Sequence, residues 1–265
     1  MADTADNASP SYLPAISKQV TELVLAGSIS HAEQAFADAA EQHGDLVVAE
    51  VLETIPPHVT ALHMAGFDGG KLSLATLLVP PKAWAASLAY IAATWNEDMI
   101  EDDPERIAES LFAHIHGVVF GTEDEERRRE LLLEASASDF GATVFAIVFS
   151  LAPKEMLEVA GEVISKGSYL TAHSSSDNDV IPLAVALAQA SEDGWDRALF
   201  ELFPEFRHSA DLADAEYSDD PDEEEPSVLQ RSTKELLYRL RKQVPSTRTA
   251  TGRTPRRTVG TGIFG

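Results

Sequence analysis

The chain has 265 residues, of which 44% are hydrophobic, enough for one large or two small packed units. It holds no cysteine, which excludes disulfides, thiolate catalysis and cysteine-based zinc sites. Its net charge is −24, and this charge is unevenly distributed. Residues 227–265 carry nine basic residues and one acid, whereas the first 226 residues carry 11 basic and 43 acidic residues. An acidic body of this kind repels nucleic acid and anionic membranes at long range.

The expected environment follows from two further features of the sequence. No run reaches the roughly 18 apolar residues that a membrane span needs. The first 14 residues are polar and acidic, without the basic and apolar regions of a signal peptide. We therefore expect a soluble cytoplasmic protein.

The first hundred residues predict a series of short helices. Apolar side chains recur at helical spacing from Leu13 to Val24, and Gly27 ends that stripe. Ser30 and Asp45 are the predicted N-caps of the next two helices. The helices expected in this half cover 13–24, 31–43, 46–55, 58–66, 72–79 and 82–98, with a glycine turn at 67–71 and an acidic linker at 99–103.

The stretch from 104 to 166 is the predicted centre of the fold. It divides into four helix-length segments separated by glycine, proline, serine and acidic residues. The third segment, from Phe140 to Leu151, is apolar almost all round, and such a helix must be buried by its neighbours. We therefore expect it to be the central core helix.

The whole chain is predicted to be all-α, an irregular array of short helices. A regular solenoid is the alternative, because Pro56, Pro80 and Pro104 are evenly spaced and each opens a new segment. Beyond 166 the sequence predicts a polar loop and the helices 180–190 and 193–206. The expected organisation is a disordered start (1–10), an acidic helical domain (11–209), an acidic disordered linker (210–226), a short basic helix (227–243) and a basic disordered tail (244–265).

Several polar groups resemble known sites only in part. The sequence from Asp68 to Ser73 has a Gly-Gly-Lys but lacks the spacing and the preceding strand of a phosphate-binding loop. His114 and His116 are two apart, so on a helix they point in different directions and cannot chelate one ion. Ser174–Ser176 lies beside His173 and Asp177, whereas the members of a catalytic triad converge from distant segments. The acids at 219–225 lack the spacing of a calcium loop. We therefore expect no catalytic residue, no metal site and no cofactor.

The basic C-terminal segment is the predicted interaction site. Its arginines suit phosphates or an acidic protein face, and its glycines permit tight backbone geometry in a groove. Its last eight or so residues, a Thr-Val-Gly followed by an apolar-Gly ending, resemble the C-terminal loading peptides of encapsulated cargo proteins. This resemblance covers too little of the chain to assign a family. The predicted partner-binding residues are Arg239, Arg241, Lys242, Arg248, Arg253, Arg256, Arg257, Val259, Ile263 and Phe264.

These features favour a non-catalytic adaptor or assembly protein, an acidic helical platform whose basic arm binds a protein partner. One alternative is a nucleic-acid-associated protein whose tail contacts phosphates. Another is an enzyme whose site is assembled from scattered residues. A fourth possibility is that the tail only folds back on the acidic body by electrostatic attraction. The oligomeric state stays open.

Overall fold

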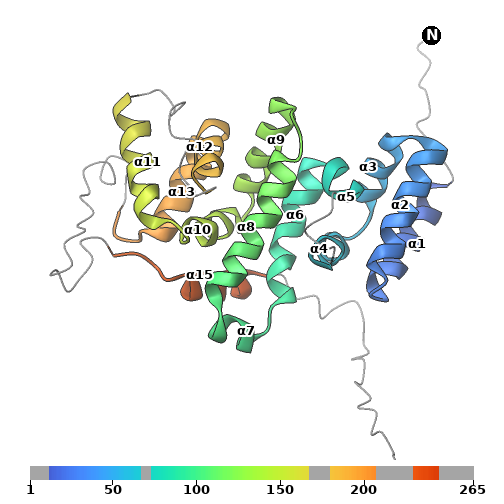
Figure 1. Cartoon of the computed structure of the whole chain (residues 1–265), viewed down its shortest axis with the longest axis horizontal. Helices are drawn as coiled ribbons and strands as arrows, with labels where there is room; N and C mark the ends of the chain where they lie inside the picture. Colours follow the sequence, from blue (N-terminus) through green and yellow to red (C-terminus); the bar gives the residue numbers. More distant parts are fainter. Residues whose placement is uncertain (1–11, 67–72, 167–179, 207–228, 245–265) are drawn as a thin grey trace, which may run out of the picture.

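The computed structural model describes residues 12–66, 73–166, 180–206 and 229–244. Within these ranges every regular element is a helix, which confirms the predicted all-α array of short helices (Figure 1). The predicted disordered start, linker and tail lie largely outside the described residues. The polar loop at 167–179 lies outside them as well.

The N-terminal helices form one end of the molecule (Figure 1). Gly27 and Gly44 adopt positive φ values of 75° and 89°, which only glycine takes without strain, so the chain turns sharply there. The second helix begins at Ile29 with Ser28 before it, two residues earlier than predicted. The helices at this end are α1 (Leu13–Leu25), α2 (Ile29–His43), α3 (Asp45–Thr54), α4 (Pro57–Gly66) and α5 (Leu74–Leu78).

The middle of the chain departs from the prediction in one place. The expected helix 82–98 is interrupted, because Trp95 takes an extended conformation and the Asn96 side chain caps a new helix at Met99 N. The segment 99–103, predicted as a linker, is therefore mostly helical. The elements are α6 (Pro81–Ile91), the 3-10 helix η1 (Ala92–Thr94), α7 (Glu97–Asp102), α8 (Pro104–Phe120) and α9 (Glu125–Ala137).

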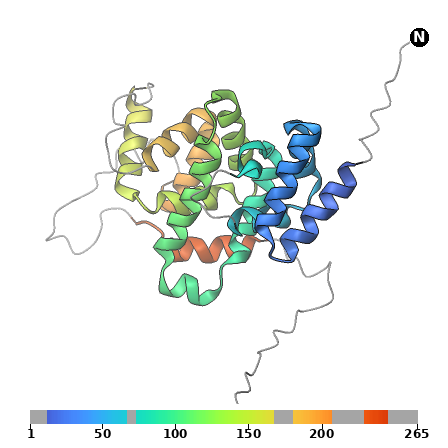
Figure 2. The ribbon, with the colours of Figure 1, turned by 45° about the vertical axis from the view of Figure 1, so that its right-hand side comes forward.

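The C-terminal half surrounds a buried helix, α10 (Gly141–Phe149). Apart from the partly exposed Ala142, every residue of α10 is buried, as predicted for the segment 140–151. The remaining helices are α11 (Pro153–Lys166), α12 (Val180–Ala190), α13 (Glu192–Leu202) and α15 (Thr233–Gln243). Figure 2 shows α15 crossing the molecule between α7 and the helices α8 and α10, and it contacts all three.

Helix contacts distinguish the irregular array from a solenoid. In a solenoid each repeat contacts only its neighbours in sequence. Here α6 packs against α9, and α10 packs against both α13 and α15. The array is therefore irregular. No single described helix is long and apolar enough to cross a membrane; α9 and α10 qualify as a pair by length and composition, but they are bent by 108°.

The contact between α6 and α8 contains a partly buried histidine. The indole Nε1 of the fully buried Trp84 donates to Nε2 of His114 at 3.4 Å, which requires that nitrogen to be unprotonated. Burial among apolar side chains lowers the pKa of His114 from 6.5 to about 4. The folded chain therefore holds this histidine neutral at pH values where the unfolded chain protonates it.

Acidification should destabilise the fold through His114. As the pH falls from 6.5 towards 4, His114 binds a proton in the unfolded state but not in the folded state. This difference lowers the free energy of unfolding by at most about 3 kcal/mol. His114→Gln keeps an acceptor for Trp84 and removes the titration, so its unfolding free energy should fall less across this pH range. Denaturant titrations at several pH values measure this. The exposed His31→Gln is the matched control, and identical pH profiles for wild type and His114→Gln would contradict the assignment.

Candidate interaction site at the C-terminal helix

The sequence around α15 favours a helix with defined ends. The Ser232 hydroxyl accepts from Glu235 N at 3.2 Å, a typical N-cap. Glu235 lies in the first turn, and Arg241 and Lys242 lie in the last, so their charges complement the helix dipole. Pro245 follows directly and disfavours helical geometry at Val244. These local features position the rest of the interface.

The apolar side of α15 belongs to the core of the protein. The side chains of Leu236, Leu237 and Leu240 are 0% exposed and lie in the same hydrophobic cluster as those of α10. Full burial of a leucine side chain contributes about 1.5–3 kcal/mol. The basic helix is therefore a packed element of the described structure.

Glu201 of α13 is the main acidic contact of α15. Its carboxylate accepts two hydrogen bonds from the guanidinium of Arg239, from Nε at 2.5 Å and from Nη2 at 3.1 Å. Arg231, just before the helix, places Nη1 3.3 Å from the same carboxylate. The Glu201 side chain is only 16% exposed, so this paired geometry is shielded from solvent.

A second set of contacts joins α15 to α7. The carboxylate of Glu101 accepts from Lys234 Nζ at 2.5 Å and from the Tyr238 hydroxyl at 2.7 Å. One turn further along α15, Arg241 Nη1 lies 3.6 Å from Glu97. The first two bonds lower the pKa of Glu101, and the bond to Glu101 raises the pKa of Tyr238.

Both ends of α15 are also held by neutral hydrogen bonds to α10. At its start, the hydroxyls of Thr233 and Ser150 lie 2.9 Å apart. At its end, the Gln243 amide donates to the Thr143 hydroxyl at 3.2 Å. The helix is therefore fixed along its whole length, and the point from which residues 245–265 continue is fixed with it.

The predicted partner-binding residues fall into two groups. Arg239 and Arg241 contact Glu201 and Glu97 within the same chain, whereas Lys242 is exposed. That any of these three binds a partner stays a prediction. The other predicted residues lie outside the described residues: Arg248, Arg253, Arg256, Arg257, Val259, Ile263 and Phe264.

Sequence reasoning did not identify the acidic side of this interface. Glu97, Glu101 and Glu201 lie far from α15 in sequence, and each belongs to a segment with several other acids. The one available signal was the opposite charge of the body and the C-terminal segment. That signal indicates attraction without naming the residues that meet.

A separate polar cluster joins α2, α4 and the start of α5. The Glu33 carboxylate accepts from Ser73 Oγ at 3.0 Å and from Leu74 N at 2.5 Å, and it lies 3.2 Å from Nε2 of the buried His63. Burial raises the pKa of Glu33, but the hydrogen bonds from His63 and Leu74 N outweigh it and hold that pKa below its ordinary value. In a catalytic triad the serine donates to the histidine; here Ser73 donates to the carboxylate, so the geometry favours a structural role.

The other candidate groups have distinct surroundings. His114 contacts Trp84, whereas the His116 ring lies between Phe112 and Phe120, at centroid distances of 5.5 and 4.8 Å. The two histidines therefore contact different neighbours. Asp68–Lys71, the residues around Ser174–Ser176 and the acids at 219–225 lie outside the described residues.

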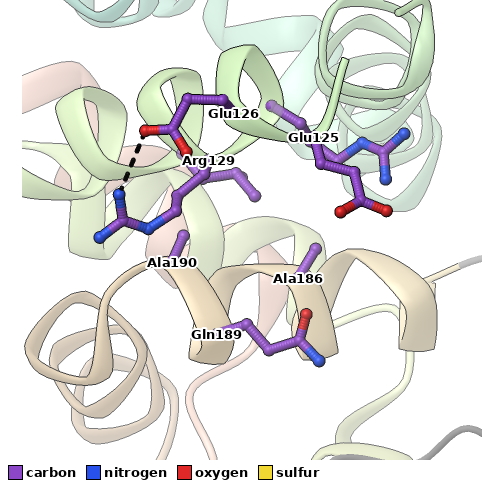
Figure 3. Close-up of a pocket in the computed structure, with 8 residues that line it drawn as sticks. Glu125, Glu126, Arg129, Ala186, Gln189 and Ala190 are labelled. Carbon is purple, nitrogen blue, oxygen red and sulfur yellow. Dashed lines mark hydrogen bonds and ion pairs between the residues drawn. The ribbon is translucent and has the colours of Figure 1, made fainter. Parts of the chain in front are cut away.

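Figure 3 shows an open pocket of about 290 Å³ between the start of α9 and α12. Glu126 and Arg129 on α9 form an ion pair at 3.5 Å, and Ala186 and Ala190 point towards them from α12. Both charged side chains are more than half exposed, so water screens their interaction. This geometry alone favours no particular chemistry.

Comparison with known proteins gave no match to the chain among protein-family models, curated proteins or solved structures. The contacts of α15 are therefore the main guide to function.

Removing the Glu201 carboxylate should loosen α15. Glu201→Gln removes the carboxylate that pairs with both arginines and leaves Arg231 with only the more exposed Glu235, 3.4 Å away. The unfolding free energy should therefore fall by about 1–3 kcal/mol. Amide hydrogen exchange in α15 should become faster. Glu53→Gln makes the same charge change at an exposed position on α3 and serves as the control. Equal stability of the two variants would contradict the central role of Glu201.

The bond between Tyr238 and Glu101 should be visible in the tyrosine titration. Because Glu101 holds the Tyr238 proton, this contact stabilises the fold below pH 10 and is lost as the pH rises through the raised pKa of Tyr238. Glu101→Gln should move that ionisation towards lower pH. Ultraviolet absorbance measures the ionisation of tyrosine. The titration curve of the same chain with Tyr238→Phe is subtracted in each case, which removes the signal of the other tyrosines. An unchanged midpoint would contradict the contact.

Proposed function

We propose that this protein is a non-catalytic adaptor or assembly protein, in which the helical body presents the basic segment 245–265 to a protein partner. The observation that carries the proposal is the burial of α15. A segment that follows a packed helix begins at a fixed place on the body, whereas one that follows a loose linker does not. Its binding would then be tied to the position and orientation of the body.

The charge distribution supports the same segment. Of the nine basic residues between 227 and 265, Arg231, Lys234, Arg239 and Arg241 lie close to carboxylates of the chain. The remaining five are Lys242, Arg248, Arg253, Arg256 and Arg257, and no acid follows Glu235. We propose that an acidic protein surface is what these five residues bind. Ordering a segment on binding costs entropy, so the affinity should be modest and sensitive to salt.

The burial of α15 determines how this proposal is tested. Truncation at 226 would remove Leu236, Leu237 and Leu240 from the core, so lost binding could reflect lost stability. The comparison therefore uses the full chain and a variant with Arg248, Arg253, Arg256 and Arg257 changed to glutamine. A second variant changes Val259, Ile263 and Phe264 to alanine. Both leave every described contact of α15 in place.

Nuclease-treated affinity pull-downs from native lysate should recover a protein partner with the wild-type chain and lose it with the arginine variant. Recovery should weaken between low and moderate salt. The control changes Lys18, Lys82 and Arg129 to glutamine and Gln19 to glutamate, all at exposed positions of the body, and so alters the net charge by the same −4. An unchanged set of partners with the arginine variant would contradict the proposal. Loss of recovered material on nuclease treatment alone would indicate nucleic acid as the ligand instead.

A further inference from the structure

A second open pocket of about 460 Å³ lies between α7 and the first turns of α8, two helices that α15 also contacts. Trp95, Met99 and Ile107 supply its apolar wall, and Asp102, Asp103 and Arg106 are its charged residues. Met99 is 45% exposed, so its side chain offers apolar contact area to a ligand. The pocket therefore combines apolar contact area with charged residues at its edge.

The charge around this pocket is strongly negative. The segment from Glu97 to Ser110 contains seven acidic residues and a single base, Arg106. Asp102 and Asp103 are both exposed, and the Asp103 carboxylate also accepts from the backbone N–H of Arg106 at 3.2 Å. A ligand that suits this pocket has apolar side chains for Trp95 and Met99 and positive charges for the surrounding carboxylates.

The C-terminal end of α15 lies next to the same acidic segment. Arg241 Nη1 is 3.6 Å from Glu97, and α15 contacts η1, which directly precedes Trp95. Two residues after Arg241 the helix ends, and the chain continues as residues 245–265. Residues 245–265 therefore follow a helix, α15, that contacts both helices of the pocket, α7 and α8.

The sequence of that continuation has the chemistry the pocket requires. Residues 245–265 carry four arginines and no acid, and Val259, Ile263 and Phe264 stand near the end. An extended chain covers about 3.3–3.6 Å per residue, so the 12 or more residues from Val244 to Arg256 can reach well past the pocket. A tether of this length gives an effective concentration on the order of millimolar, which favours a contact within the chain.

We propose that the segment Arg256–Phe264 docks in the pocket between α7 and α8 of the same chain. Ile263 and Phe264 contact the apolar wall around Trp95 and Met99. Arg256 and Arg257 face the surrounding carboxylates, among them the exposed Asp102 and Asp103 of the pocket. The inference goes beyond the proposed function, because it concerns a contact within the chain that needs no partner. A partner that binds the same segment must compete with this contact. Only the undocked fraction of the chain is free to bind, so the partner's apparent association constant falls in proportion to that fraction.

Disulfide trapping in the full chain tests this contact, because the native sequence has no cysteine. One double variant is Ser110→Cys with Gly262→Cys, which places one thiol at the pocket and the other beside Ile263. The matched control is Glu109→Cys with Gly262→Cys, and the Ser110→Cys variant also carries Glu109→Gln, so that both chains lack the Glu109 carboxylate. Position 109 is also exposed and equally far along the tether, but it faces about 100° around α8. Rates are normalised to the reaction of each thiol with a small disulfide reagent.

Docking should make the intramolecular disulfide at position 110 form at least about fivefold faster than at position 109, since the tether alone treats both alike. Changing Arg256 and Arg257 to glutamine, or Asp102 to asparagine, should bring the two rates together. Equal rates without these changes would overturn the proposal. Predominance of a disulfide-linked dimer would also overturn it, because the occupant would then be a second copy. Neither result depends on whether a partner is found in the pull-down.

Discussion

The burial of α10 is the constraint on which the rest of the structure depends. All but one of its residues are buried, so it needs cover on every side, and no single neighbour can supply this. Helices α8, α9, α12 and α13 surround it, and α15 completes the enclosure from beyond the segment 207–228. Leu236, Leu237 and Leu240 are fully buried for this reason. A helix that looks in sequence like the start of a basic tail is thus required by the core.

Charge determines how α15 is oriented once its leucines are buried. Glu201 pairs with two arginines on one side, and Glu101 binds Lys234 and Tyr238 on another. The exposed pairs contribute little to stability by themselves, because water screens them. The Glu201 pair is more shielded and has two parallel hydrogen bonds from Arg239, so it distinguishes one orientation of the helix from others. Apolar burial therefore holds α15 in place, and the ion pairs select its register.

Most of the fold could be predicted from local patterns, and the candidate site could not. The apolar run at 140–151 and the leucine spacing before 243 depend only on neighbouring residues, and both helices formed where expected. The break at Trp95 was missed because alanine-rich periodicity continues through it, while the Asn96 cap that starts α7 is a single residue. Folding of the basic segment back on the acidic body was among the alternatives, but the specific contacts of α15 could not be predicted. Lys234 and Glu101 are 133 residues apart, and nothing in a single sequence pairs one lysine with one of 44 acids.

The double role of α15 decides how variants of this region can be interpreted. A substitution within the helix changes the cover of α10 and, at the same time, the place from which residues 245–265 continue. Lost binding in such a variant therefore has two physical causes that a binding assay cannot separate. Substitutions beyond Val244 leave the described core contacts intact, so a loss of binding there reports on the segment itself. If Arg256–Phe264 docks beside α7, a weakened pocket should strengthen partner binding, whereas a weakened α15 should not. These opposite effects on partner binding would distinguish two roles of this region: α15 holds the segment in place for a partner, and the pocket withholds it from the partner.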